Sequence, residues 1–225
     1  MSAGQGQLIL DLEQRPALGA EDFLVAPSNR AAADIIDRWP DWPHASVVVV
    51  APAGAGKTHL ANVWRLKSKA ARLTAPALAE SDVAAATGAL LVEDLHAGIG
   101  DERALFHLLN LVRERKMSML LTSRAAPGEL EVHLPDLRSR LRALPVVAIS
   151  PPDETLLKAV LVKHFADRQL TVEPPVISYI ARYMEQSMEA AAAIVAAIDR
   201  AAMTAHRRVT RALAAEILTL QRPGG

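Results

Sequence analysis

The run Val47–Val50 and the residues directly after it constrain the fold more than any other part of the sequence. Four consecutive valines leave no polar face, which is typical of a strand buried on both sides in a parallel sheet covered by helices. The valines lead into Ala-Pro-Ala-Gly-Ala-Gly-Lys-Thr and then into a helical stretch at His59–Lys69. This order of strand, glycine-rich loop and helix is the context that a phosphate-binding loop requires.

The loop carries the residue types that hold a nucleotide. Glycines let backbone N–H groups point inward at phosphate oxygens, and the helix N-terminus adds partial positive charge. The ammonium of Lys57 would neutralise the β and γ oxygens, and the Thr58 hydroxyl would be a ligand for magnesium. Ala51 stands where the pattern has its first glycine, and a plain turn before a helix is the alternative interpretation. The expected nucleotide contacts are Pro52, Ala53, Gly54, Ala55, Gly56, Lys57, Thr58 and His59.

Strands and helices alternate up to residue 150 and only helices follow. Further strands are expected at Ala89–Val92, Met119–Leu121 and Val146–Ile149, with a helix at Glu102–Arg115. We expect a flexible arm over 1–20, an α/β core over 21–150 and an all-helical subdomain over 151–225. In the helical part, a helix opens at Asp153-Glu154 and others are expected at Pro175–Met184, Met188–Thr204 and Arg211–Leu220, the last capped by Thr210.

The composition limits the kinds of partner and surroundings that we expect for this chain. Lys plus Arg and Asp plus Glu number 25 each, so no overall positive field draws the chain to DNA. The basic cluster around Arg207, Arg208 and Arg211 is explained equally well by a solvated helix end. No apolar stretch is long enough for a membrane span, there is no cysteine, and the N-terminus lacks the layout of a signal peptide. We therefore expect a cytoplasmic protein that does not enter a membrane.

The run Leu90–Asp94 is a strand that ends in two acids. Beside the loop, Glu93 would hold magnesium and Asp94 would polarise the attacking water as a catalytic residue. An aspartate is the usual first acid, and Glu93 places its carboxylate one methylene further out, which octahedral magnesium tolerates poorly. Solvated acids at a strand end are the alternative.

Two later residues complete a nucleotide-switch interpretation. Ser123, just past a strand, is placed to sense the γ-phosphate or the attacking water. Arg140 could reach the γ-phosphate of a neighbouring subunit as an arginine finger, because its planar fork clamps two phosphate oxygens. The alternative is that Arg138, Arg140 and Arg142 are only surface charges.

The sequence resembles the DnaA clade of AAA+ proteins, and within it the Hda-like regulators. The resemblance rests on Gly54–Leu60, on Leu137–Leu141 and most specifically on Ile198–Thr210, and it covers nearly the whole chain. It implies an AAA+ core with a five-stranded parallel sheet, followed by a small helical lid, with ADP or ATP between them. No counterpart of the initiators' helix-turn-helix domain follows the lid before Gly225, so we expect no direct sequence-specific DNA binding.

Hda-like proteins carry an N-terminal peptide that docks on the DNA polymerase sliding clamp, and Gln7–Leu12 resembles it. An extended arm can insert alternate leucines into apolar pockets while the Gln7 amide supplies hydrogen bonds. The expected clamp-binding residues are Gln7, Leu8, Leu10 and Leu12. An edge strand or a hydrophobic tail packed on its own domain is the alternative.

The lid also departs from the family. The arginine that senses nucleotide in the DnaA clade corresponds to Glu189, and an acid there would repel phosphate; Arg182 or Arg200 would be the substitutes. Together with Ala51 and Glu93, this residue predicts a chain that binds nucleotide, ADP in particular, and hydrolyses it poorly.

Three hypotheses follow for function. The leading one is a negative regulator of replication initiation that binds the clamp and promotes hydrolysis of ATP bound to the DnaA initiator, with Arg140 acting in trans. The second is a self-contained ATPase acting in an oligomer, and pairing of two copies as a homodimer stays open. The third is a helicase-loader-like adaptor, which the low aromatic content of 4% disfavours because few rings are available to stack on bases.

Overall fold

The computed structural model describes residues 13–15, 23–205 and 207–221. These divide into two compact units, one within Arg15–Ser150 and the other made of residues 13–14 and the described residues after Ser150. The first unit contains the phosphate-loop candidate and is built around a sheet. The described residues after Ser150 form helices and no strand.

The sheet of the first unit has five parallel strands in the order β4-β5-β6-β3-β7. Their bounds are β3 (Ser46–Val50), β4 (Ala71–Thr74), β5 (Leu90–Glu93), β6 (Met119–Ser123) and β7 (Val146–Ala148). The prediction of an α/β fold with a five-stranded parallel sheet is confirmed. A separate two-stranded sheet is formed by β1 (Glu13–Arg15) and β2 (Phe23–Val25).

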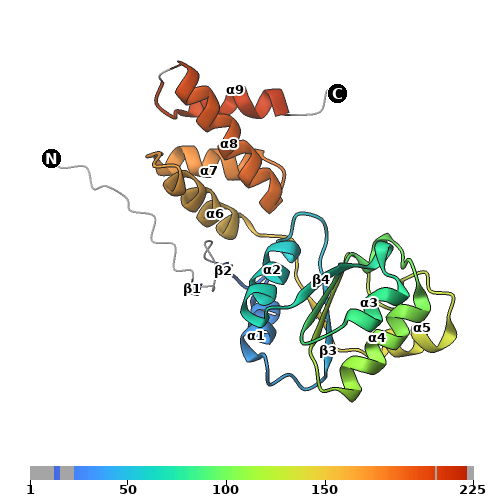
Figure 1. The fold of residues 1–225 in the computed structure, drawn as a ribbon. Coiled ribbons are helices and arrows are strands. Elements are labelled where there is room, and N and C mark those ends of the chain that lie inside the picture. Colours follow the sequence, from blue (N-terminus) through green and yellow to red (C-terminus); the bar gives the residue numbers. More distant parts are fainter. Residues whose placement is uncertain (1–12, 16–22, 206, 222–225) are drawn as a thin grey trace. The chain divides into compact units, whose positions relative to one another are not determined.

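Helices cover both faces of the five-stranded sheet (Figure 1). On one face, Val47 and Val49 pack into the cluster that holds Trp64, beneath α1 (Arg30–Arg38) and α2 (Lys57–Ser68). On the other face, Val48 packs with Leu105 of α4 (Glu102–Glu114), which α3 (Glu80–Ala85) and α5 (Pro135–Arg142) flank. Successive strand residues point to opposite faces, so the unbroken valine run is what burial on both sides requires.

Strand β4 is the main element that the sequence does not reveal. It reads Ala-Arg-Leu-Thr, lies at the edge of the sheet and has no buried side chain. Its residues therefore show neither an apolar run nor a clean alternation, and only pairing with β5 makes them a strand. Helices α1, α3 and α5 are likewise absent from the sequence-based expectation.

The helical unit contains α6 (Glu154–Asp167), α7 (Pro174–Tyr183), α8 (Met188–Ala205) and α9 (Arg211–Gln221), each close to its expected bounds. One apolar cluster joins all four. The Thr210 hydroxyl accepts the Leu213 N–H at 3.3 Å, so the expected cap of α9 is present. The Asp153 carboxylate accepts the Leu156 N–H at 2.7 Å and so caps α6, where the sequence indicated only acidic residues at the start of the helix. No helix in the described ranges has the length and apolar character needed to cross a membrane.

Replacing Asp153 with alanine tests the cap of α6. The change removes the acceptor of the Leu156 N–H, and we expect the free energy of unfolding of the helical unit to fall by about 1 kcal/mol. Urea unfolding followed by circular dichroism measures this, with Asp153→Asn as a control that keeps most of the stability. Equal loss in the two variants would contradict the assignment of the cap.

Candidate functional site

The loop over residues 51–56 joins the end of β3 to the start of α2. Gly56 is the residue before the helix and has φ of 92°, and Gly54 has φ of 69°, both in the left-handed region that glycine adopts without strain. At the start of the loop, the Ala51 N–H donates to the Ser123 carbonyl at 3.1 Å. The methyl group of Ala51 is buried in the cluster under α1 and α2, so the core accommodates the missing first glycine.

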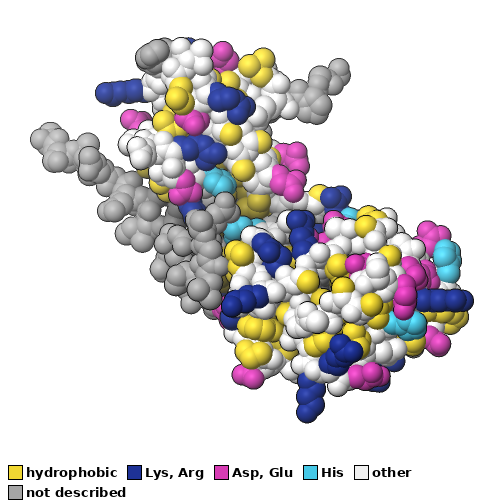
Figure 2. All heavy atoms as spheres, viewed as in Figure 1, with side chains coloured by type: hydrophobic (Ala, Val, Ile, Leu, Met, Phe, Trp, Pro, Cys, Tyr) yellow, Lys and Arg dark blue, Asp and Glu magenta, His cyan; other side chains and the backbone are white. Residues whose placement is uncertain are grey.

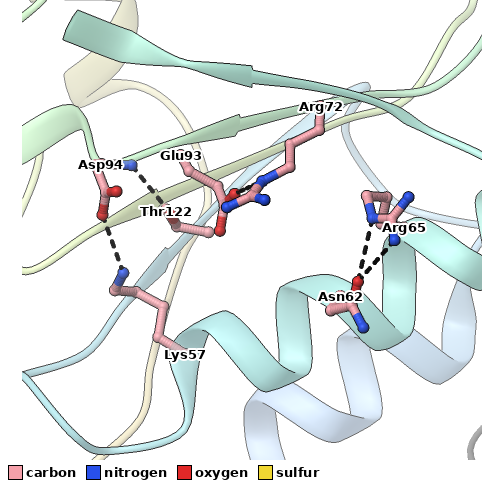
Figure 3. Close-up of polar contacts among 7 residues, drawn as sticks. All are labelled: Lys57, Asn62, Arg65, Arg72, Glu93, Asp94 and Thr122. Atoms are coloured by element: carbon pink, nitrogen blue, oxygen red, sulfur yellow. Dashed lines mark hydrogen bonds and ion pairs between the residues drawn. The ribbon is translucent and has the colours of Figure 1, made fainter. Parts of the chain in front are cut away.

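Lys57 begins α2 and faces Asp94, the residue that follows β5 (Figure 3). The Lys57 side chain is buried at 8% exposure and its Nζ lies 3.5 Å from Asp94 Oδ1, whereas the Asp94 side chain is 48% exposed. Asp94 has φ of 63°, and its N–H donates to the buried Thr122 hydroxyl at 3.2 Å. A phosphate group would replace the Asp94 carboxylate as the partner of Lys57.

Glu93, the expected magnesium ligand, is engaged elsewhere. Its side chain is buried, and Oε2 accepts a hydrogen bond and ion pair from Nε of Arg72 on β4 (Figure 3). Thr58 is exposed on the first turn of α2, as a hydroxyl ligand would need to be. Thr58 and Glu93 together do not fit a divalent cation as its ligands, because the Arg72 guanidinium already binds the Glu93 carboxylate.

Ser123 ends β6 beside the loop, paired with Val50. Its side chain is fully buried, and its hydroxyl accepts the Ala125 N–H at 3.1 Å. The expected location next to the phosphate loop is therefore observed, and the role of sensor stays a prediction. The neighbouring Thr122 belongs to no motif in the sequence, and its hydroxyl links the ends of β5 and β6 by accepting the Asp94 N–H.

His96 is a titratable residue close to the charges of Lys57 and Asp94. Burial, and then the charge of Arg124, lower the pKa of His96 below its usual value; Lys57 acts in the same direction and Asp94 opposes them. Its Nδ1 is buried and has no hydrogen-bond partner among the described residues. The lowered pKa favours the neutral form of the His96 imidazole.

A segment ahead of α1 packs against the first turn of α2. The ring of Phe23 stacks on that of His59, with centroids 5.5 Å apart and planes 11° apart. The buried Asn29 side chain holds this segment in shape, accepting the Ala26 N–H at 2.8 Å and donating to the Leu24 carbonyl at 2.9 Å. The Phe23 ring thus lies beside the first turn of α2 at His59. No motif in the sequence indicates this contact.

The three arginines of α5 have different surroundings. Arg138 donates to the Val132 carbonyl at 3.0 Å, and Arg142 donates to the Gly128 carbonyl at 3.5 Å. The guanidinium of Arg140 instead lies over the ring of Phe106, 5.1 Å from its centroid, and has no hydrogen bond to a described residue. Its N–H groups stay available to an outside acceptor.

Arg140 lies at the end of the sheet opposite to the loop. It lines a hollow of about 410 Å³ with His44 and Ser46, where β3 begins, whereas the loop leaves from the last residue of β3. A strand rises about 3.3 Å per residue, so the four steps along β3 alone separate the two ends by about 13 Å. Arg140 is therefore not placed to serve the phosphate loop of its own chain.

The remaining predicted residues are in the helical unit or outside the described ranges. Glu189 is exposed in the first turn of α8, where an acid favours the helix N-terminus. Arg182 lies over the ring of Tyr183, and Arg200 lines a hollow with Arg207. The clamp-peptide candidates Gln7, Leu8, Leu10 and Leu12 lie outside the described residues.

No protein-family model matches the chain. The chain is 27% identical over 235 residues to the chromosomal replication initiator protein DnaA of Thermus thermophilus, covering 91% of this chain and 53% of the relative. It spans about half the length of the curated relatives it matches.

Among the solved structures with a similar fold are two DnaA structures. Domain III of Thermotoga maritima DnaA superposes with a TM-score of 0.78 at 19% identity, covering 89% of this chain and 95% of that one. AMPPCP-bound DnaA from Aquifex aeolicus gives a TM-score of 0.69 at 20% identity, covering 82% and 65%. The chain thus has the AAA+ fold, and its sequence similarity to DnaA extends over most of its length.

The Lys57–Asp94 pair predicts opposite effects of two substitutions on ADP binding. Lys57→Ala removes the cation that the phosphates need, and we expect binding to be lost. Asp94→Asn removes the competing carboxylate, and because a half-exposed ion pair is worth up to about 1 kcal/mol, affinity should rise by up to about fivefold. Isothermal titration calorimetry measures both.

The matched control is Glu114→Gln, the same charge change at an exposed position of α4. It should leave ADP affinity unchanged. Weaker ADP binding in Asp94→Asn would show that Asp94 does not compete with phosphate for Lys57.

Proposed function

We propose that this chain is a cytoplasmic regulator of replication initiation that binds ADP or ATP, docks on the DNA polymerase sliding clamp and promotes hydrolysis of ATP bound to the DnaA initiator. Nucleotide binds at the loop before α2 and keeps the chain in the conformation that promotes hydrolysis by DnaA. The chemistry takes place in the partner's site, to which this chain contributes Arg140.

Similarity to DnaA supports a role in replication initiation and a surface able to meet a DnaA molecule. The loop with Gly54, Gly56 and Lys57 supports nucleotide binding, because its backbone and charge suit phosphate oxygens. Relatives of this fold have been solved with the ATP analogue AMPPCP. Charges of both signs are interspersed over the visible face of each unit (Figure 2), which gives no basic patch for DNA there.

The placement of Arg140 carries the proposal. Its guanidinium lies at the amino end of β3, away from its own loop, and rests on Phe106 without a hydrogen bond to a described residue. The start of α5 is held by Glu102, whose carboxylate accepts the N–H groups of His133 and Leu134. A rigidly mounted arginine with unused donors is suited to a neighbour's γ-phosphate.

The chain's own loop is less suited to hydrolysis. The first acid, Glu93, is occupied by Arg72, so the usual metal-assisted route lacks its carboxylate. A nucleotide held this way acts as a structural ligand, which supports a regulator over a motor.

The proposal is tested by measuring ATP hydrolysis by DnaA in the presence of clamp loaded on DNA, with and without this chain. Arginine fingers contribute on the order of 10³-fold or more in nucleotide hydrolases, so Arg140→Ala should reduce the rate to that of DnaA alone. Arg142→Ala, two residues along the same helix, is the control and should keep the stimulation. No stimulation by the unsubstituted chain would reject the proposal.

The clamp-docking part rests on Gln7–Leu12. Removing residues 1–12 should abolish binding to the clamp and the clamp-dependent stimulation, while Arg140→Ala leaves clamp binding intact.

A self-contained ATPase is the second candidate, and Asp94 favours it. This acid remains beside Lys57 with half of its side chain exposed, where it could polarise a water molecule while Arg140 serves a second copy of the chain. Hydrolysis by the purified chain that rises steeply with protein concentration and is lost in Lys57→Ala would favour this candidate.

A further inference from the structure

We propose that Arg72 takes the place of a divalent cation beside Glu93, so that this chain binds adenine nucleotide without magnesium. The inference rests on the proposed nucleotide binding and adds how the phosphates are held. Arg72 belongs to no motif in the sequence and lies on the edge strand β4.

Strand register explains how the two side chains meet. In the parallel pair of β4 and β5, Arg72 is opposite Leu91, and Glu93 follows Leu91 on the same face of the sheet. The Arg72 side chain therefore reaches diagonally along this face to Glu93, a distance that long side chains can span. Because β4 is an edge strand, the rest of the guanidinium stays hydrated, and the side chain is 60% exposed.

Burial makes a cation at Glu93 necessary. The Glu93 side chain is only 5% exposed, and a carboxylate in such surroundings is costly without a countercharge. A guanidinium stays protonated at all ordinary pH values and is tethered to the sheet, whereas magnesium gives up its water ligands reluctantly. Arg72 therefore satisfies Glu93 permanently, before any ligand arrives.

The Arg72–Glu93 ion pair also disfavours binding of magnesium at Glu93. To reach Glu93, the cation would have to displace Arg72 and then lie close to a second positive charge. The phosphates instead have Lys57, the N–H groups of the loop and the positive end of α2, none of which depends on a metal. We therefore expect the affinity for ADP to be the same with and without magnesium.

The experiment is isothermal titration of the full chain with ADP, in buffer containing either millimolar magnesium chloride or EDTA. For the unsubstituted chain the two dissociation constants should agree within about twofold. In Arg72→Gln the buried Glu93 loses its countercharge and recruits the metal, so magnesium should strengthen ADP binding by roughly tenfold.

Two further variants sharpen the test. Arg65 is a residue of α2 whose guanidinium donates to Asn62 and not to Glu93 (Figure 3). Arg65→Gln removes this positive charge and should leave the affinity for ADP the same with and without magnesium. Arg72→Gln combined with Glu93→Gln removes both charges of the pair, and its binding should also be indifferent to magnesium.

The outcomes separate the two proposals. ADP binding by the unsubstituted chain only when magnesium is present would overturn the role of Arg72, and this arm does not depend on the folding of any variant. Equal binding by Arg72→Gln in the two buffers would overturn it as well. Absence of ADP binding in both buffers would instead overturn the proposed nucleotide-binding function on which it rests.

Discussion

The burial of β3 on both faces is the constraint on which the rest of the structure depends. Its valines pack under α1 and α2 on one face and under α4 on the other, while β6 and β7 flank it in the sheet. The chain leaving β3 is held on both sides, because Ala51 donates to the Ser123 carbonyl and the Val50 carbonyl accepts the Ile149 N–H at 2.8 Å. The position at which the loop begins is therefore fixed. Its glycines adopt positive φ without strain.

Two ion pairs at the carboxyl ends of the strands, Lys57–Asp94 and Arg72–Glu93, differ in the burial of their carboxylates. The Asp94 carboxylate is half-exposed, so water or a phosphate can replace it beside Lys57 at small cost. The Glu93 carboxylate is buried, and separating it from Arg72 would leave a charge in a medium of low polarity, which costs several kcal/mol. One pair is thus exchangeable and the other structural, although both acids come from adjacent positions at the end of β5.

The loop and Arg140 lie at opposite ends of β3. In the proposed assembly, one molecule's loop would meet a different surface of its neighbour, the one that presents an arginine, so that contact would be head to tail and not self-complementary. Phe106 and Glu102, both on α4, position the α5 end of this arrangement. The same core helix therefore packs the sheet and mounts the arginine.

The sequence by itself determined the α/β core, the helical unit and the location of the phosphate loop, because these follow from local patterns: the valine run, the glycines before Lys57 and the apolar period of the helices. Tertiary structure alone decided that Glu93 has Arg72 as its partner. These residues are 21 positions apart, and β4, with mostly exposed side chains, is a strand only through pairing with β5. It also decided that Phe106 supports Arg140, which depends on the packing of α4 against α5. Local periodicity carries no information about which strand or helix becomes a neighbour, so partners across the sheet had to come from the folded chain.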